Sequence, residues 1–214
     1  KQLTTSSDME TIISINCTFP KKMSLICNEL GVKFIHLSTD CVFSGSIGNY
    51  TESSIPDPAD YYGVTKFLSE FLHPSALILR KSTIGLELGS THGLIEWFLD
   101  AGLEIDGYKN AIYSGLTTKE FSRAISCIIR SEDYHAGLFN LASTSISKFD
   151  LLSRLSDRIF AEHSKIININ TDFKCNRSLN SLKFNKMYDF QSQSWDQMLD
   201  GLGKEILQRN SQLN

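Results

Sequence analysis

The chain has 214 residues, of which 41% are hydrophobic and 21% charged, and its formal net charge is -3. A chain of this length and composition can bury a sizeable core, which excludes a disordered or fibrous protein. The positive charge is scattered along the sequence, so there is no electrostatic reason to expect binding to nucleic acid or to an anionic membrane.

The apolar segments and the cysteines further limit the classes of protein to which the chain can belong. No apolar stretch approaches the roughly 20 residues that a membrane-spanning helix needs, so we expect a soluble protein. The cysteines are odd in number and widely separated, which favours neither a disulfide framework nor a zinc site: Cys17, Cys27, Cys41, Cys127 and Cys175. We therefore expect reduced thiols, a cytoplasmic location and no bound metal.

The first predicted elements are a helix and a short strand. Apolar residues recur at helical spacing over residues 9–30, with Pro20 placed to kink or divide the helix and Gly31 placed to end it. Residues 33–38 predict a strand that ends in a polar cluster and is followed by a loop rich in glycine and proline. Polar residues at the carboxyl end of a strand are the usual site geometry of an open α/β sheet.

The rest of the chain predicts alternating helices and strands. Asp57 and Pro58 predict the N-cap and first turn of a helix that runs to about residue 72, and residues 76–80 predict a buried strand. Further helices are predicted near 92–101, 118–131, 147–160 and 194–207, with β-like pieces near 138–140 and 166–169. Ser147 with Asp150 predicts a capping box. This alternation predicts a mainly parallel sheet with helices on both faces.

One pair of residues carries a chemical signal. Tyr62 and Lys66 are four residues apart and share one face of a predicted helix. A nearby ammonium favours the phenolate and lowers the tyrosine pKa from about 10 toward a range useful for proton transfer. Such a pair is common on surface helices and is weak evidence alone. Thr39 at the end of the preceding strand adds a hydroxyl that could polarise a carbonyl group, and together the three residues predict a catalytic site.

The sequence around these residues closely resembles that of a known protein family. The segments S-T-D-C-V-F-S-G (38–45), Y-T-E (50–52) and Y-G-V-T-K-F-L-S-E (62–70) resemble the dTDP-4-dehydrorhamnose reductase branch of the extended short-chain dehydrogenases/reductases. Looser matches follow at 79–82, 115–118 and 177–181.

The resemblance implies a fold and a division of the chain. It implies an α/β, Rossmann-like, doubly wound, mainly parallel sheet with a smaller C-terminal substrate-binding lobe. Residues 1–82 would be the C-terminal portion of the NAD(P)-binding domain, carrying the catalytic residues. Residues 83–214 would be mainly the substrate-binding lobe, with some segments returning to the Rossmann core.

The resemblance also implies roles around the cofactor. Tyr62 would donate a proton to the keto oxygen of the sugar, Lys66 would bind the nicotinamide ribose and tune Tyr62, and Thr39 would bind the substrate oxygen. NADPH or NADH would deliver the hydride. Ser38 and Ser82 would complete the cofactor site.

Three further residues are candidates for substrate binding. Asp40 would bind substrate or organise its turn, and Glu52 would shape the loop over the sugar or simply be solvated. Arg177 suits a pyrophosphate because its guanidinium fork allows bidentate binding.

Four residues are expected to be structural or incidental. We interpret His92 as an incidental loop histidine, the alternative being contact with substrate or phosphate. We interpret Trp97 and Phe98 as core residues, the alternative being a stacking platform, and His36 as a packed residue inside a strand.

Two departures from the family pattern are visible. The glycine-rich phosphate-binding turn of the family is absent, because Gly45 and Gly48 follow the wrong strand and Gly85 and Gly89 lack the context. We interpret the chain as a fragment that is inactive alone, the alternative being natural loss of ordinary cofactor binding. Residues 89–98 also differ from the rhamnose-enzyme pattern, which leaves the particular sugar open.

The predicted function is NAD(P)H-dependent reduction of a nucleotide-linked 4-keto-6-deoxy sugar in deoxysugar and surface polysaccharide biosynthesis. One alternative is an NAD-dependent sugar nucleotide epimerase or dehydratase. Another is a non-catalytic regulatory subunit resembling that of methionine adenosyltransferase, because a fold does not imply an activity. The expected partner is the nucleotide-linked sugar, with neither nucleic acid nor membrane, and a homodimer is left open.

Overall fold

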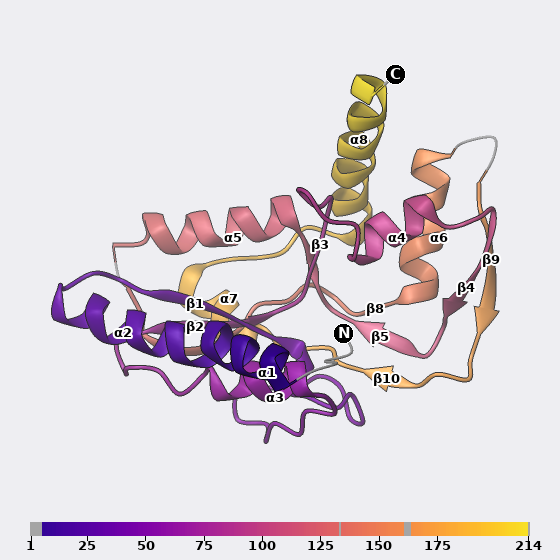
Figure 1. Ribbon diagram of the computed structural model, residues 1–214. Helices are drawn as coiled ribbons and strands as arrows, with labels where there is room; N and C mark the ends of the chain where they lie inside the picture. The colour runs from indigo at the N-terminus through magenta and orange to yellow at the C-terminus, as the bar shows by residue number, and fades with distance from the viewer. Residues whose placement is uncertain (1–5, 133, 161–163, 214) are drawn as a thin grey trace.

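A three-stranded parallel sheet forms the centre of the protein in a computed structural model that describes residues 6–132, 134–160 and 164–213 (Figure 1). The strands lie in the order β1 (Ile35–Thr39), β2 (Leu77–Lys81) and β7 (Gly137–Asn140). The central strand β2 is almost entirely buried, as expected for a parallel strand with both faces covered. The predicted α/β class and parallel pairing are confirmed.

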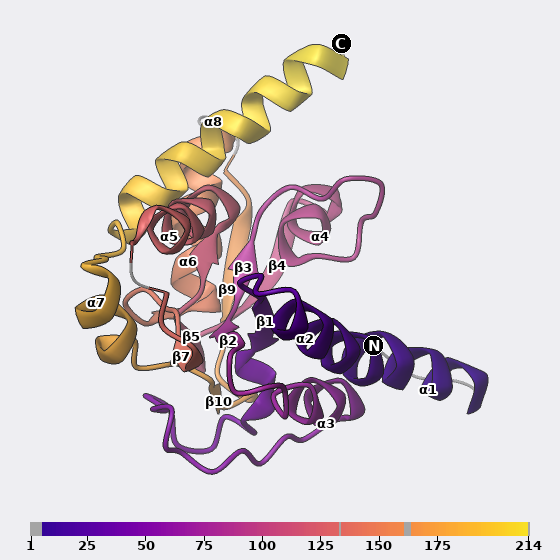
Figure 2. The same cartoon turned by 90° about the vertical axis from the view of Figure 1, so that its left-hand side faces the viewer.

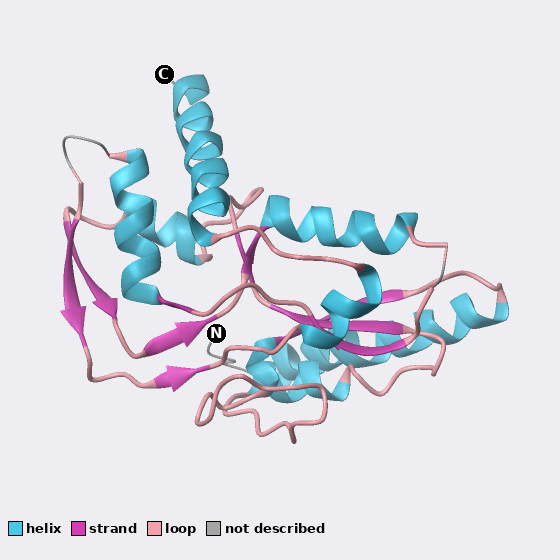
Figure 3. Ribbon diagram, turned by 180° about the vertical axis from the view of Figure 1, so that it is seen from behind, coloured by secondary structure: helices cyan, strands magenta, loops and turns pink. Residues whose placement is uncertain are grey.

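Helices cover both faces of this sheet. Figure 3 shows α5 (Thr118–Arg130) on one side and the group α1 (Ser6–Ile13), α2 (Phe19–Glu29) and α3 (Tyr61–Leu68) on the other. Helix α7 (Leu182–Tyr188) packs beside β7. The arrangement is the predicted doubly wound one. Since β7 pairs with β2, a segment far beyond residue 82 belongs to the same sheet. The division into a cofactor-binding part up to residue 82 and a substrate-binding lobe after it stays a prediction.

The predicted N-terminal helix is divided, as Pro20 indicated. A π-helical turn, Ser14–Thr18, separates α1 from α2, and Pro20 lies in the first turn of α2, where its missing N–H group does no harm. Gly31 has φ +66° and ends the helix as predicted. Helices α2 and α3 lie next to each other (Figure 2).

Helix α3 begins later than predicted. Its N-cap is Asp60, whose carboxylate accepts a hydrogen bond of 2.7 Å from the backbone N–H of Gly63. Asp57 accepts hydrogen bonds from the backbone N–H (2.8 Å) and the hydroxyl (2.6 Å) of Ser44. The prediction that Asp57 caps the helix is therefore wrong, because its carboxylate is used to close the loop between β1 and α3.

Three small sheets build the remainder. Their strands are β3 (Thr83–Ile84) with β6 (Leu116–Thr117), β4 (Glu104–Tyr108) with β9 (Ile166–Asn170), and β5 (Ala111–Tyr113) between β10 (Cys175–Asn176) and β8 (Ile146–Ser147). The helices are α4 (Leu94–Asp100), α6 (Lys148–Ile159) and α8 (Trp195–Leu213). Of the predicted capping box at α6, the N-cap bond is present: the backbone N–H of Asp150 donates a hydrogen bond of 2.9 Å to the hydroxyl of Ser147. The Asp150 carboxylate accepts from that hydroxyl at 2.6 Å.

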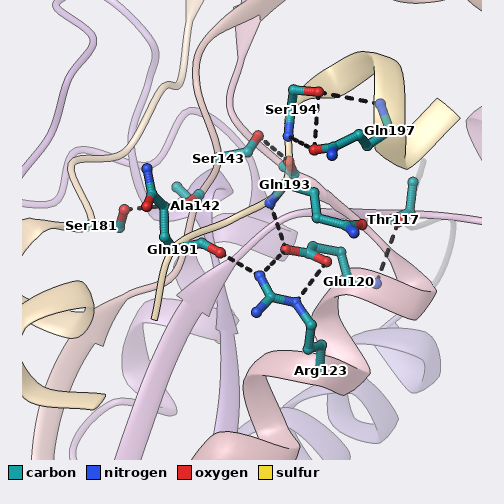
Figure 4. Close-up of polar contacts among 11 residues, drawn as sticks. Thr117, Glu120, Arg123, Ala142, Ser143, Ser181, Gln191, Gln193, Ser194 and Gln197 are labelled. Carbon is teal, nitrogen blue, oxygen red and sulfur yellow. Dashed lines mark hydrogen bonds and ion pairs between the residues drawn. The ribbon is translucent and has the colours of Figure 1, made fainter. Parts of the chain in front are cut away.

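A buried carboxylate ties α5 to the segment that leads into α8 (Figure 4). Glu120 is 2% exposed and accepts a hydrogen bond of 2.6 Å from the guanidinium of Arg123 and one of 2.8 Å from the backbone N–H of Gln193. Arg123 also donates to the backbone oxygen of Gln191. Because the charge of Glu120 is paired and hydrogen-bonded, its burial is tolerated, and the start of α8 is fixed against the helix that covers the sheet.

In the part of the chain that the structure describes, none of the helices combines the length and the apolar character needed to cross a membrane.

Candidate active site

A cavity of about 250 Å³ opens beyond the carboxyl ends of β1 and β2 and extends to the sheet that contains β5. Its wall includes three of the predicted site residues, Asp40, Ser82 and Arg177, which come from three separate segments. This is the place where open α/β sheets bind their ligands. The structure therefore brings together the predicted substrate residues Asp40 and Arg177 and the predicted cofactor residue Ser82.

Thr39 lies at the end of β1 and organises the turn next to the cavity. Its hydroxyl accepts a hydrogen bond of 3.2 Å from the backbone N–H of Cys41 and donates one of 3.2 Å to the carboxylate of Asp40. Burial raises the pKa of Asp40, against the opposing effects of Thr39 and Arg177. Thr39 thus holds Asp40 and Cys41 in the cavity wall.

Tyr62 lies in the first turn of α3, close to Thr39. Burial of the phenol and the nearby Cys41 raise its pKa, while a hydrogen bond with Thr39 acts in the opposite direction; as a residue, Tyr62 remains 42% exposed. The predicted lowering of this pKa is not seen in the structure. The phenol is protonated at neutral pH, which is the state of a proton donor.

Lys66 lies one turn after Tyr62 and points to the strand that carries Thr39. Its ammonium group donates a hydrogen bond of 2.5 Å to the backbone oxygen of Leu37. Burial and, after it, the charge of Lys81 lower the pKa of Lys66. This hydrogen bond uses one of the three N–H donors of the ammonium group.

Gly63 lets α3 approach the turn after β1 closely. The sequence pattern alone did not predict this role for Gly63. A Cβ atom on Gly63 would lie 2.3 Å from the backbone oxygen of Cys41 and 2.8 Å from the Cβ of Pro58. On the other side of α3, the amide of Asn16 donates a hydrogen bond of 3.1 Å to the hydroxyl of Thr65. The helix that carries Tyr62 and Lys66 is thus fixed between that turn and the π-helical turn.

Ser38 is part of a buried ionic network. Its hydroxyl donates a hydrogen bond of 2.6 Å to Glu70, which forms an ion pair of 2.6 Å with Arg80. The Arg80 guanidinium is 5.0 Å from the ring centre of Phe43. The network joins β1, β2 and the end of α3. The hydrogen bond to Glu70 uses the donor of the Ser38 hydroxyl. The predicted role of Ser38 in cofactor binding stays a prediction.

Glu52 lies away from the cavity wall and holds the loop after β1 against the sheet. Its carboxylate accepts a hydrogen bond of 2.8 Å from the backbone N–H of Asn140, at the end of β7. The side-chain amide of Asn140 donates in turn to the backbone oxygen of Tyr50, at 2.8 Å. Glu52 is therefore not simply solvated, and its role in shaping the loop over the sugar stays a prediction. The sequence does not signal this contact, because Asn140 lies far along the chain.

Arg177 enters the cavity from the segment after β10. Its guanidinium donates a hydrogen bond of 3.3 Å to the sulfur of Cys41, and its backbone N–H donates one of 3.0 Å to Ile112. Tyr50 and Leu179 form a parallel bridge that fixes the same segment to the loop after β1. Arg177 therefore faces the turn that Thr39 organises.

Two of the residues expected to be structural, His36 and Phe98, are buried, and Trp97 is not. His36 is buried and its Nε2 lies 2.8 Å from the hydroxyl of Ser69, which confirms a packed strand residue. Phe98 is fully buried, as predicted, whereas Trp97 is 46% exposed because it lies on the outer side of α4. His92 is exposed. Over the described residues there is no group of three or more His, Cys, Asp or Glu side chains arranged to hold a metal ion.

Part of the chain matches a known protein family. Residues 5–86 match the family model of the RmlD substrate binding domain. The probable low-salt glycan biosynthesis reductase of Haloferax volcanii is 36% identical over 94 residues, which cover 42% of this chain and 31% of that protein. The chain thus matches about a third of the length of this curated relative.

Solved structures share the fold at low identity. The dTDP-4-dehydrorhamnose reductase of Bacillus anthracis in complex with NADP superposes with a TM-score of 0.77 at 20% identity, covering 93% of this chain and 75% of that one. The UDP-glucuronic acid 4-epimerase of Bacillus cereus in complex with NAD gives 0.75 at 21% identity, covering 98% and 71%. The predicted resemblance is confirmed: residues 5–86 match the model of the RmlD substrate binding domain, and the chain shares the fold of these two solved structures.

Proposed function

We propose that this chain carries the catalytic and substrate-binding residues of an NAD(P)H-dependent reductase of a nucleotide-linked 4-keto-6-deoxy sugar, acting in the cytoplasm in deoxysugar and surface polysaccharide biosynthesis. The observation that carries the proposal is the position of the Tyr62 phenol beside the hydroxyl of Thr39, next to a cavity lined by Asp40 and Arg177. The match of residues 5–86 to the reductase family model supports it.

Tyr62 and Thr39 would act on the keto oxygen of the sugar. Two hydroxyl groups that converge on a carbonyl oxygen polarise it and stabilise the negative charge that develops there. When bound, the nicotinamide supplies a hydride to the carbonyl carbon. Tyr62 supplies the proton that converts the developing alkoxide to a hydroxyl group, for which a protonated phenol is required.

Lys66 would hold the cofactor in place. The ammonium group has N–H donors left over from its hydrogen bond to Leu37, and these fit the hydroxyl groups of a ribose. Once charge develops on Tyr62, the same ammonium would favour the phenolate. Ser82, in the cavity wall between β2 and β3, would contribute to the same side of the site.

Asp40 and Arg177 would position the sugar nucleotide. Arg177 offers a charged fork for the pyrophosphate, and Asp40 offers oxygen acceptors for sugar hydroxyl groups. Because both side chains line the same cavity from separate segments, the substrate would be held at two points while Tyr62 acts on its keto oxygen.

The test is reduction of dTDP-4-keto-6-deoxy sugars by the full-length protein with NADPH and then NADH, followed by the loss of nicotinamide absorbance. Tyr62→Phe removes the proton donor and should lower kcat by roughly 10²- to 10⁴-fold. Tyr61→Phe, on the same helix with Tyr61 63% exposed, is the matched control and should keep wild-type turnover.

Two results would contradict the proposal. Equal turnover in Tyr62→Phe and Tyr61→Phe would remove Tyr62 from the chemistry. Cofactor binding without turnover of any 4-keto sugar would favour the epimerase or the regulatory subunit instead.

A further inference from the structure

Three side chains in the cavity wall carry buried polar atoms that have no partner within the described structure. Five such side-chain atoms occur in the described residues, and three of them are the Oγ1 of Thr83, the Oη of Tyr113 and the Nε of Arg177. A buried polar atom without a hydrogen bond costs about 1–3 kcal/mol, so native proteins rarely keep one without a reason. Their gathering around a single cavity indicates a ligand that supplies the missing hydrogen bonds.

Tyr113 is held in position by packing. It is 8% exposed, its ring centre lies 5.6 Å from that of Trp195, and a Cβ on Gly115 would lie 2.3 Å from its ring. Burial and the nearby Asp40 raise the pKa of Tyr113 well above its usual range, so the phenol is a neutral donor. A rigid phenol that is fixed without using its hydroxyl is a preorganised hydrogen-bonding group.

Thr83 and Arg177 reach the same cavity from other elements. Thr83 begins β3, directly after Ser82. Arg177 is anchored through its terminal nitrogen to Cys41, which leaves its Nε unpaired. Three residues that line the cavity, from three separate elements, therefore carry two unpaired hydroxyl groups and one unpaired guanidinium N–H.

The charge of the cavity distinguishes between ligand classes. The buried carboxyl of Asp40 shares the cavity wall with Thr83 and Tyr113, so an anion placed beside these two hydroxyl groups would meet a competing carboxyl. A hydroxyl group can accept from Tyr113 and from the Nε of Arg177 and can donate to Asp40 or Thr83, while the second terminal nitrogen of Arg177 is left for the pyrophosphate. The polar atoms around Tyr113 and Thr83 therefore fit a neutral ring with several hydroxyl groups better than an anion.

We propose that Tyr113, Thr83 and Arg177 form a subsite that recognises the hydroxyl groups of the sugar ring in a nucleotide-linked sugar, and that Tyr113 determines specificity for the sugar. The inference rests on the proposed function for the identity of the ligand class, but it does not require that the sugar be reduced. It predicts that the sugar part of the ligand contributes binding energy through the Tyr113 hydroxyl.

The experiment compares the affinity of the full-length protein for dTDP-glucose and for dTDP by calorimetric titration. The wild type should prefer dTDP-glucose, and Tyr113→Phe should reduce this preference by roughly three- to tenfold. The ligand-free melting temperature of Tyr113→Phe should stay equal or rise, because the removed hydroxyl has no partner in the free protein. Thr83→Val, which removes the second unpaired hydroxyl, should act in the same direction.

Tyr134→Phe is the matched control, because the Tyr134 hydroxyl donates to the backbone oxygens of Phe34 (2.7 Å) and Ser75 (3.0 Å). It should lower the melting temperature and leave the preference unchanged. The inference is overturned if the wild type does not prefer dTDP-glucose over dTDP, or if both Tyr113→Phe and Thr83→Val keep the full preference. A protein that prefers dTDP-glucose but reduces no 4-keto sugar would overturn the proposed reduction and leave the subsite standing.

Discussion

His36 shows how one buried residue makes stability depend on pH. Burial, with a smaller effect of Lys66, lowers the pKa of His36 to about 4 in the folded protein, whereas an unfolded chain binds this proton near pH 6.5. Between these two values the unfolded state holds more protons, so stability rises with pH. The contribution of His36 is complete above about pH 6.5 and is lost as the pH falls toward 4.

We expect acidification from pH 7 to pH 4.5 to lower the free energy of unfolding by up to about 3 kcal/mol through this residue alone. Urea unfolding over this pH range measures it. His36→Gln cannot titrate and should have a flatter pH dependence, whereas His92→Gln at an exposed histidine should keep the wild-type slope. Identical slopes for His36→Gln and wild type would show that other groups cause the loss.

The candidate catalytic residues could be proposed from the sequence, but their contacts could not. The spacing of Tyr62 and Lys66 and the polar end of β1 depend on local periodicity, which the sequence displays directly. The partner of Glu52 is the backbone of Asn140, and that contact depends on how two distant strands meet. The unpaired hydroxyl of Tyr113 likewise has no sequence signal, because it depends on the absence of a hydrogen-bond partner in the folded structure.

Helix α3 keeps its catalytic position through a glycine. A Cβ at position 63 would overlap the backbone oxygen of Cys41, a neighbour that cannot rotate away, so the helix or the turn would have to move. We expect Gly63→Ala to destabilise the protein by about 1–3 kcal/mol and to lower turnover, because Tyr62 is displaced from Thr39.

The measurement is thermal or urea unfolding together with kcat. Gly201→Ala is the matched control: it lies in α8 with nothing within 4 Å of the added Cβ, and it should stabilise the protein by up to about 1 kcal/mol. A Gly63→Ala protein as stable and as active as the wild type would show that the close approach has no functional importance.

Elements with a clear hydrophobic pattern were predictable, and others, such as β4 and α7, were not. Helices α5 and α6 and strands β1, β2, β7 and β9 follow periodic patterns and were expected close to their observed bounds. Strands of two residues, such as β3 and β10, are too short to show a period of two, and they form because tertiary packing brings them to a partner. The division of the first helix was signalled by Pro20, whereas the π-helical turn itself was not.

At the scale of the whole molecule, a buried ion pair joins the helix layer to the central sheet. Glu70 and Arg80 have side chains 7% and 2% exposed, and Glu70 also receives the hydrogen bond from Ser38. Removing one partner leaves a buried charge uncompensated, whereas replacing both with apolar groups does not.

We expect Glu70→Ala to lower the free energy of unfolding by about 3–5 kcal/mol, and Glu70→Ala combined with Arg80→Met to recover part of that loss. Equilibrium unfolding in urea measures both variants. Arg154→Gln, which breaks a 3.7 Å pair in which Arg154 is 47% exposed and Asp196 64% exposed, should change stability by less than about 1 kcal/mol. Equal losses in the single and double variants would contradict the role of the unpaired charge.

The contact between Arg177 and Cys41 spans 136 residues of sequence. Contacts this far apart form slowly, because a long loop must be closed before they are made. Thr39, Tyr62 and Lys66 leave the ribosome well before the segment after β10 does. During synthesis the candidate catalytic side chains therefore exist for some time without the segment that completes the neighbouring cavity, and a ligand of that cavity can assist folding only at its last stage.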